Sequence, residues 1–134
     1  MGALELTSLR KAIMTLEKAL LAYQKDPKNE NNFARDAAIQ RFEYTYELCH
    51  KMLRRYLEIT EPEKEVIDQL TFPDLIRLAA ERGLVLNSWD QWAHYRDARN
   101  TTSHAYNEDK AIAIVEDIPD FLTEAKFLLK QLER

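Results

Sequence analysis

Apolar residues recur at alternating steps of three and four near the start of the chain. This spacing places them on one face of an amphipathic helix. The residues of this stripe are Leu6, Leu9, Ile13, Leu16, Leu20 and Tyr23. Residues 26–32, DPKNENN, then interrupt the period with a proline and three asparagines, so a turn is expected there.

A second long helix is predicted for residues 33–59, before Pro62. Its expected buried face is rich in aromatic residues, and its length suits the central helix of a bundle. The residues expected on that face are Ala38, Phe42, Leu48 or Cys49, Met52, Tyr56 and Leu57.

Residues typical of helix starts and helix ends predict two shorter helices. Thr71 followed by Pro73 and Asp74 is typical of a helix start, and Gly83 suits a left-handed helix end. Ser88 marks the next start, and this helix is expected to end near residues 100–102, where two threonines precede a serine.

The last helix is predicted to begin after Asn107, a good N-cap followed by two acidic residues. Its apolar stripe keeps one phase across Pro119, which favours one kinked helix over two helices. The stripe contains Ile112, Val115, Ile118, Leu122, Ala125, Leu129 and Leu132.

These elements predict an all-α fold: an antiparallel up-and-down bundle of about five helices, with a four-helix-bundle core and a short insert helix, in a single domain spanning residues 1–134. Only 2 glycines and 4 prolines occur, too few for the turns of a β-sandwich or barrel. Burial is expected in particular for Leu9, Ile13, Leu16, Phe42, Tyr56, Ile112, Val115, Leu122 and Leu129.

Charge and composition narrow the classes of function. The chain has 19 basic and 23 acidic residues, a formal charge of −4, which argues against a strongly basic nucleic-acid binder but leaves room for a local basic site. Its single cysteine excludes an intramolecular disulfide. With neither a signal peptide nor an apolar run of about 20 residues, we expect a cytoplasmic protein without a membrane partner.

Most chemically capable side chains are expected to be structural. Cys49 is isolated in a buried helical position, and His50 points about 100° away from it, so no metal pair is indicated. His94 is expected to have a packing or surface role. The acidic residues Glu58, Glu61, Glu63 and Glu65 are expected to form a solvated loop edge. No cofactor or metal site is predicted.

One stretch, residues 92–106, differs from the rest. Arg96 and Arg99 share a face in the last turn of the predicted fourth helix, where cations are favoured. His104 could approach Arg99 only if the helix ends between them, which is where Thr101 and Thr102 stand. Together with the N-terminus of the next helix, these side chains would form a phosphate site with a proton-transfer group.

At these residues the chain resembles the HEPN superfamily, and more narrowly the nucleotidyltransferase substrate-binding family, whose mark in this branch is R-x4-H-x-Y. The sequence reads Arg99-Asn100-Thr-Thr-Ser-His104-Ala-Tyr106, without departure from that pattern. The LRKAIMTLEKAL, RDAAIQRFEYTYELCHKMLRRYL and TFPDLIRLAAERGL blocks are also similar to the family.

The resemblance implies a homodimer paired with a minimal nucleotidyltransferase, the product of a neighbouring gene, as a toxin–antitoxin system. It implies a metal-independent ribonuclease in which Arg99 grips the RNA phosphate, His104 moves a proton and Asn100 orients one of them. Arg96 would add a phosphate contact. The partner would transfer AMP to Tyr106 and thereby close the site.

The alternative is a non-catalytic subunit that binds substrate or scaffolds a two-component nucleotidyltransferase. The negative charge favours this alternative, because phosphate contacts dominate RNA affinity. The intact motif favours the ribonuclease. In either case the chain carries no catalytic carboxylates for nucleotide transfer, so we expect that it is not itself a nucleotidyltransferase.

Overall fold

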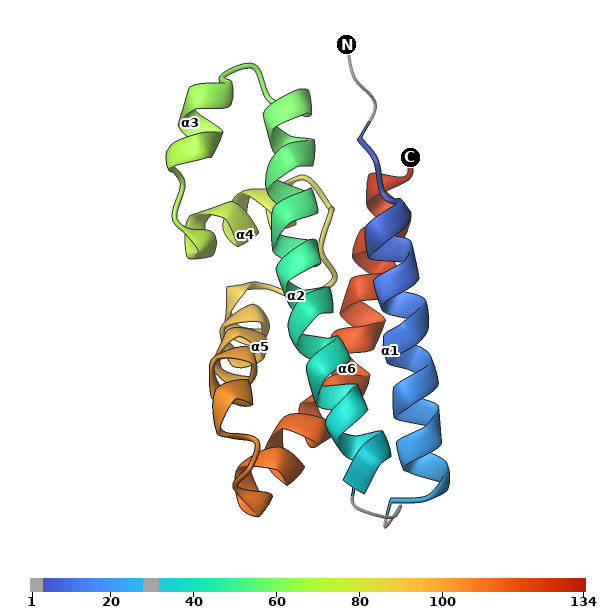
Figure 1. Ribbon diagram of the computed structural model, residues 1–134. Helices are drawn as coiled ribbons and strands as arrows, with labels where there is room; N and C mark the ends of the chain where they lie inside the picture. The colour runs from blue at the N-terminus through green and yellow to red at the C-terminus, as the bar shows by residue number, and fades with distance from the viewer. Residues whose placement is uncertain (1–3, 28–31) are drawn as a thin grey trace.

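The protein is described here by a computed structural model covering residues 4–27 and 32–134 (Figure 1). This part of the chain contains six α-helices, one 3₁₀ turn and no strand. In chain order the elements are α1 Thr7–Lys25, α2 Phe33–Thr60, α3 Lys64–Gln69, α4 Phe72–Glu81, α5 Trp89–Thr101, η2 Thr102–His104 and α6 Glu108–Leu132. Most of the predicted turn at residues 26–32, namely residues 28–31, lies outside the described residues, as do residues 1–3.

Four helices form the body of the molecule, and successive members run in opposite directions. Figure 1 shows α1 descending from the N-terminus, α2 rising, α5 descending and α6 rising to the C-terminus, while α3 and α4 cover the upper part of α2. The predicted all-α antiparallel bundle with an insert is therefore confirmed. The α5–η2–α6 connection lies at the lower end, beside the first turns of α2.

Aromatic side chains dominate the centre of the core. Phe121 on α6 meets Phe42 edge to face at 5.0 Å between ring centroids, and it meets Tyr95 at 5.4 Å. Trp92 and Tyr95 pack edge to face at 5.3 Å. Such pairs add about 0.5–1.5 kcal/mol beyond the burial of their area. They fix α5 against α2 and α6, and so fix the start of the connection that carries the motif.

Most of the residues predicted to begin or end a helix do so in the structure. The Thr71 hydroxyl accepts a hydrogen bond from the Asp74 backbone N–H at 3.3 Å, and the Asn107 Oδ1 accepts one from Lys110 at 3.1 Å. Gly83 follows α4 with φ +72°, a conformation that costs glycine little. The helix α5 begins after Ser88, although the Ser88 side chain makes no capping bond. Pro119 lies inside one continuous helix, as its stripe indicated.

One residue of the predicted core is on the surface. Ile112 is 39% exposed because the buried stripe of α6 runs through Ala111, Ile114, Val115 and Ile118, and Ile112 is rotated about 100° from Ala111. The prediction that Ile112 is buried is therefore wrong.

Two other predicted core residues, Tyr56 and Leu129, are only partly buried and pack against the core from its edge. The remaining residues singled out for burial are buried: Leu9, Ile13, Leu16, Phe42, Val115 and Leu122.

The helix α3 was not expected. Its six residues are too few to show a period, and only Ile67 among them is buried. Its end is held from another helix, because the Arg54 guanidinium donates to the carbonyl oxygens of Ile67 at 2.7 Å and Leu70 at 3.1 Å. The segment interpreted as a solvated loop edge thus contains a helix, and Glu61 before it forms an ion pair with Arg82 at 2.8 Å.

Candidate functional site

The motif begins in the last turn of α5, with Arg99 and Asn100, and continues through the connection to α6. The helix α5 ends at Thr101, and η2 carries the chain through Thr102 to His104, so the predicted helix end between Arg99 and His104 is present. Two backbone bonds hold the connection in place: the Ala105 N–H donates to Thr102 O at 3.2 Å, and the Asn107 N–H donates to His104 O at 3.0 Å. Asn107 then caps α6.

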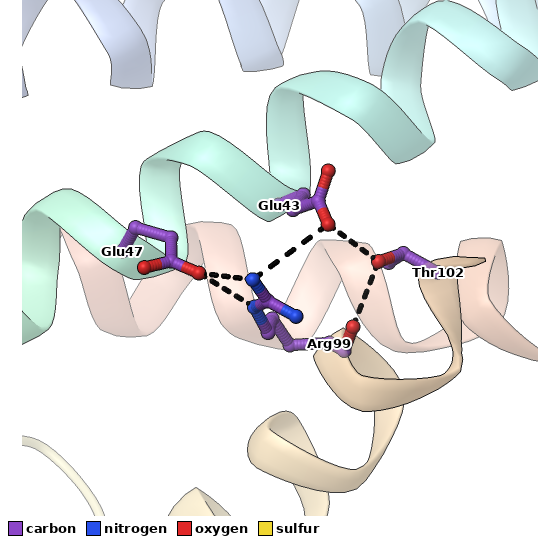
Figure 2. A network of polar contacts seen from close by, with 4 residues as sticks. All are labelled: Glu43, Glu47, Arg99 and Thr102. Carbon is purple, nitrogen blue, oxygen red and sulfur yellow. Dashed lines mark hydrogen bonds and ion pairs between the residues drawn. The ribbon is translucent and has the colours of Figure 1, made fainter.

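The Arg99 side chain is held by two carboxylates of α2 (Figure 2). Its Nε donates to Glu47 Oε1 at 2.7 Å, its Nη2 also donates to that oxygen, and Nη2 lies 3.8 Å from Glu43 Oε2. Thr102 joins the network, because its hydroxyl lies 2.8 Å from both Glu43 Oε2 and the Arg99 carbonyl oxygen. The Arg99 side chain remains 31% exposed, so it is fixed but accessible.

Glu43 and Glu47 are functional candidates that the sequence analysis missed. They stand one helical turn apart on α2, a spacing too common to be a signal. Their partner Arg99 is 52 residues from Glu47 in sequence. Only the packing of α5 beside α2 brings them together.

Arg96, the predicted supporting phosphate contact, is placed differently from Arg99. Its guanidinium lies over the ring of Trp89, 4.8 Å from the centroid, where the negative face of the indole attracts the cation. This contact holds the side chain against the surface one turn before Arg99.

The remaining motif side chains are more open to solvent than Arg99. Asn100 and His104 are exposed, and Tyr106 is 86% exposed, the highest value among the large apolar and aromatic side chains described. The rings of His104 and Tyr106 lie edge to face with centroids 6.1 Å apart. A phenol so exposed is open to modification by a second protein.

The structure brings some of the predicted site residues together and keeps others apart. His104 meets Tyr106, and Arg99 meets Glu47, but in residues 4–27 and 32–134 no hydrogen bond joins Arg99 to His104. One chain therefore presents an ion-paired arginine in the last turn of α5 and an exposed imidazole on the connection that follows, without closing a site between them.

The other candidate groups have structural surroundings. Burial raises the pKa of the Cys49 thiol well above its usual value, which makes it a poor nucleophile. Burial, assisted by Arg54, lowers the pKa of His50, whose ring packs 4.0 Å from that of Phe72. His94 Nε2 lies 2.7 Å from Asp117 Oδ1 on α6.

A buried carboxylate on α6 had no sequence signal. Glu124 is fully buried and accepts hydrogen bonds from the Leu86 N–H at 2.6 Å and from the Asn87 side-chain amide at 2.9 Å. Desolvation raises its pKa. Glu124 ties the loop before α5 to α6.

The described residues contain no group of three or more histidine, cysteine, aspartate or glutamate side chains placed to hold a metal ion. Within the same ranges, no helix is both long and apolar enough to cross a membrane.

Comparison with known proteins gives one family and several relatives. The profile of the family described as "Nucleotidyltransferase substrate binding protein like" matches residues 4–134. A Haemophilus influenzae protein named "Probable ribonuclease HepT" is 43% identical over 97 residues, which are 72% of this chain. The match spans 66% of that relative, slightly less than two thirds of its length.

Two solved structures share the fold over nearly the whole chain. A Haemophilus influenzae protein, described as revealing the fold of a substrate binding domain of a nucleotidyltransferase, superposes with a TM-score of 0.89 at 35% identity and covers 97% of this chain and 100% of its own. A Thermus thermophilus protein gives a TM-score of 0.76 at 34% identity and covers 94% of this chain and 99% of its own.

Proposed function

The chain belongs to the nucleotidyltransferase substrate-binding protein family of the HEPN superfamily, and on that premise we propose that it is the ribonuclease toxin of a pair whose other member is a minimal nucleotidyltransferase. One observation carries this proposal. Arg99 stands in the last turn of α5, where Glu47 pairs with it, and His104 and Tyr106 stand exposed on the connection that follows. The relative named as a probable ribonuclease supports it.

The chemistry follows from the two ionisable groups. His104 takes the proton of an RNA 2′-hydroxyl, whose oxygen then bonds to the adjacent phosphorus while the bond to the 5′-oxygen breaks. The 5′-oxygen leaves with the bonding electrons and gains a proton, which yields a 2′,3′-cyclic phosphate and a 5′-hydroxyl. Arg99 stabilises the charge that develops on the phosphoryl oxygens. Asn100 orients the reacting groups, and Arg96 contacts a neighbouring phosphate.

The exposure of His104 supports a site shared by two copies of the chain. Because Arg99 and His104 do not meet within one chain, a two-fold axis near His104 would place a second set of motif residues opposite the first. The exposed Ile112 on the first turns of α6 gives this end of the molecule apolar surface for such an interface. Light scattering at micromolar concentration should show a homodimer, and a monomer would contradict the shared site.

Tyr106 is the proposed point of control. Its exposed phenol oxygen bonds to the α-phosphorus of ATP bound by the partner nucleotidyltransferase, pyrophosphate leaves with the bonding electrons, and the phenol proton passes to a base on the partner. The added AMP places bulk and negative charge two residues from His104. RNA phosphates are then repelled from the site, and the toxin is silenced.

A second candidate function is that of a non-catalytic subunit of a two-component nucleotidyltransferase. The pairing of Arg99 with Glu47 and Glu43 favours it, because the carboxylates compete with a phosphate for the same guanidinium. In this case the motif would serve as the surface on which the partner docks.

Replacement of Tyr106 by phenylalanine separates these functions. Tyr106→Phe keeps the ring and removes the hydroxyl that would accept AMP. We expect cells that express this variant to stop growing even when the active nucleotidyltransferase is co-expressed, while the wild-type chain is neutralised and gains the mass of AMP. Co-expression with a nucleotidyltransferase lacking its catalytic carboxylates is the control, in which the wild-type chain should also be toxic.

Two results would count against the proposal. Neutralisation of Tyr106→Phe by the active partner would show that control does not pass through this hydroxyl. Normal growth with unmodified wild-type chain and no partner would favour the non-catalytic subunit.

A further inference from the structure

A groove of about 430 Å³ lies beside the motif, between the first turns of α2 and the η2–α6 connection. Its volume falls within the ~300–1,000 Å³ of small-molecule sites. The α2 side contributes Arg35, Gln40 and Glu43, and the connection contributes Thr102 and Tyr106. No step of the proposed RNA cleavage uses this groove.

Arg35 is the cation of the groove, and it is unusually buried for a charged residue, at 8% exposed. Its Nε donates to Asp36 Oδ1 at 3.2 Å, and its Nη1 donates to Glu108 Oε1 at 3.0 Å. These two bonds use two of the five N–H donors of the guanidinium. Further donors can therefore serve an acceptor that enters the groove.

The other polar groups decide what kind of acceptor fits. Asp36 and Glu43 also line the groove, so a bare phosphate would meet two carboxylates beside one arginine. A nucleotide brings a phosphodiester for Arg35 together with amino and hydroxyl groups that can donate to carboxylates. The Gln40 side chain can both donate and accept. This mixture favours a nucleotide over an inorganic anion.

Tyr106 connects the groove to the motif. Its exposed ring lines the groove and lies against His104. Glu43 and Thr102 belong both to the groove lining and to the network that holds Arg99 (Figure 2). A group attached to the Tyr106 oxygen would therefore stand at the rim of the groove, and a group inside the groove would stand beside the Arg99 network.

Resting on the adenylylation proposed above, we infer that the groove docks the nucleotide carried by Tyr106, with Arg35 binding its phosphodiester and the polar side chains of α2 binding its nucleoside. The docked nucleotide packs beside Glu43 and Thr102 and keeps Arg99 paired with its carboxylates. Silencing then depends on the binding of the nucleotide in the groove as well as on the bulk that the modification adds. Docking also shields the phosphodiester from hydrolysis.

The experiment measures that shielding on the whole protein. The wild-type chain and its variants are co-expressed with the nucleotidyltransferase, checked for the AMP adduct by intact mass, and exposed to a nonspecific phosphodiesterase. Arg35→Gln removes the cation, and Gln40→Glu places a negative charge in the groove at an exposed position that leaves the Arg35 ion pairs in place. Arg10→Gln is the matched control, because Arg10 pairs with Glu133 next to the C-terminus.

We expect both groove variants to lose AMP about tenfold faster than the wild type, the effect of losing one charge-assisted hydrogen bond. Arg10→Gln should lose it at the wild-type rate. If Arg35→Gln does not fold, Gln40→Glu decides the result alone.

Other results would overturn the inference in distinguishable ways. Equal rates of AMP loss from the wild type and both groove variants would contradict docking in the groove but not the adenylylation of Tyr106. A wild-type chain that never gains AMP would contradict both the adenylylation and the docking. Equal rates combined with a raised KM for RNA in the unmodified groove variants would assign the groove to a nucleotide of the RNA instead.

Discussion

Two carboxylate networks hold the elements around the motif, and they differ in their contact with water. Glu124 on α6 is fully buried and binds the loop before α5 through the backbone of Leu86 and Asn87. Glu47 on α2, by contrast, is 53% exposed and binds the Arg99 side chain. The first network joins a buried carboxylate to backbone N–H groups and one side-chain amide, and the second is built around an ion pair at the surface.

The difference shows how the fold separates support from reactivity. A buried carboxylate cannot exchange its partners without leaving polar groups unpaired, so Glu124 is committed to holding the loop. A surface ion pair contributes about 0–1 kcal/mol, so Arg99 can leave Glu47 for an RNA phosphate at little cost. A buried carboxylate thus holds a loop in place, whereas an exposed carboxylate leaves the arginine that it pairs with available to a ligand.

The largest expected effect is on activity. Arg99→Ala and His104→Ala should each lower RNA cleavage by about 10²–10⁴-fold, as is usual when a positioned acid–base group or its electrostatic partner is lost. Both residues lie outside the apolar core, so the circular dichroism spectrum and melting temperature should stay near those of the wild type. Cleavage is measured on the purified chain with a labelled RNA.

Matched controls for this prediction lie elsewhere on the surface. Arg77→Ala on α4 and His94→Ala on α5 remove an exposed arginine and an exposed histidine that stand outside the motif. Cleavage by both should stay within about twofold of the wild type. Equal losses in the controls and the motif variants would show that the site has been misplaced.

The next effect is on stability. Glu124→Ala should lower the free energy of unfolding by about 2–4 kcal/mol, because it leaves the N–H groups of Leu86 and Asn87 without their acceptor. Urea denaturation measures the change. Glu116→Ala, an exposed position on the same helix, should change stability by less than about 0.5 kcal/mol. A cost for Glu124→Ala no larger than for Glu116→Ala would contradict the supporting role.

A smaller effect is expected at the exposed network. Glu47→Gln should cost less than about 1 kcal/mol of stability, because solvent screens its ion pair with Arg99. The same urea experiment applies, with the exposed Lys51→Gln one turn away on α2 as control. A loss as large as that of Glu124→Ala would mean that Arg99 is structural rather than available to RNA.

The smallest effect is a pH dependence. Because burial raises the pKa of Glu124 in the fold above its unfolded value of 4.5, the folded chain keeps this proton to a higher pH than the unfolded chain. The stability of the wild type relative to Glu124→Gln should therefore rise as pH falls through the raised pKa of the folded state towards 4.5, and then level off. A relative stability that falls over this range would show that the carboxylate form is the one favoured in the fold.

The sequence predicted the parts of the fold that local signals govern. The Thr71 cap and the Gly83 helix end depend on neighbouring residues only, and both are present. Ile112 was misplaced because it stands one residue from the true stripe of α6, where an alanine, Ala111, fills the buried position. A small residue at a buried position gives a weak hydropathy signal.

The candidate site was predictable only in part. The poor helix formers Thr101, Thr102 and Ser103 correctly located a helix end between Arg99 and His104. Neither the Glu47 partner of Arg99 nor the buried Arg35 could be found, because each depends on the packing of helices that are distant in sequence. The assignment of the motif residues to catalysis stays a prediction.

One measurement tests the central claim most directly. The chain is purified without its partner, shown by intact mass to carry no AMP on Tyr106, and incubated with RNA in the presence of a chelator. The account predicts that the RNA is cut, that the fragments end in a 2′,3′-cyclic phosphate and a 5′-hydroxyl, and that His104→Ala leaves the RNA whole. Uncut RNA with the unmodified wild-type chain would contradict it.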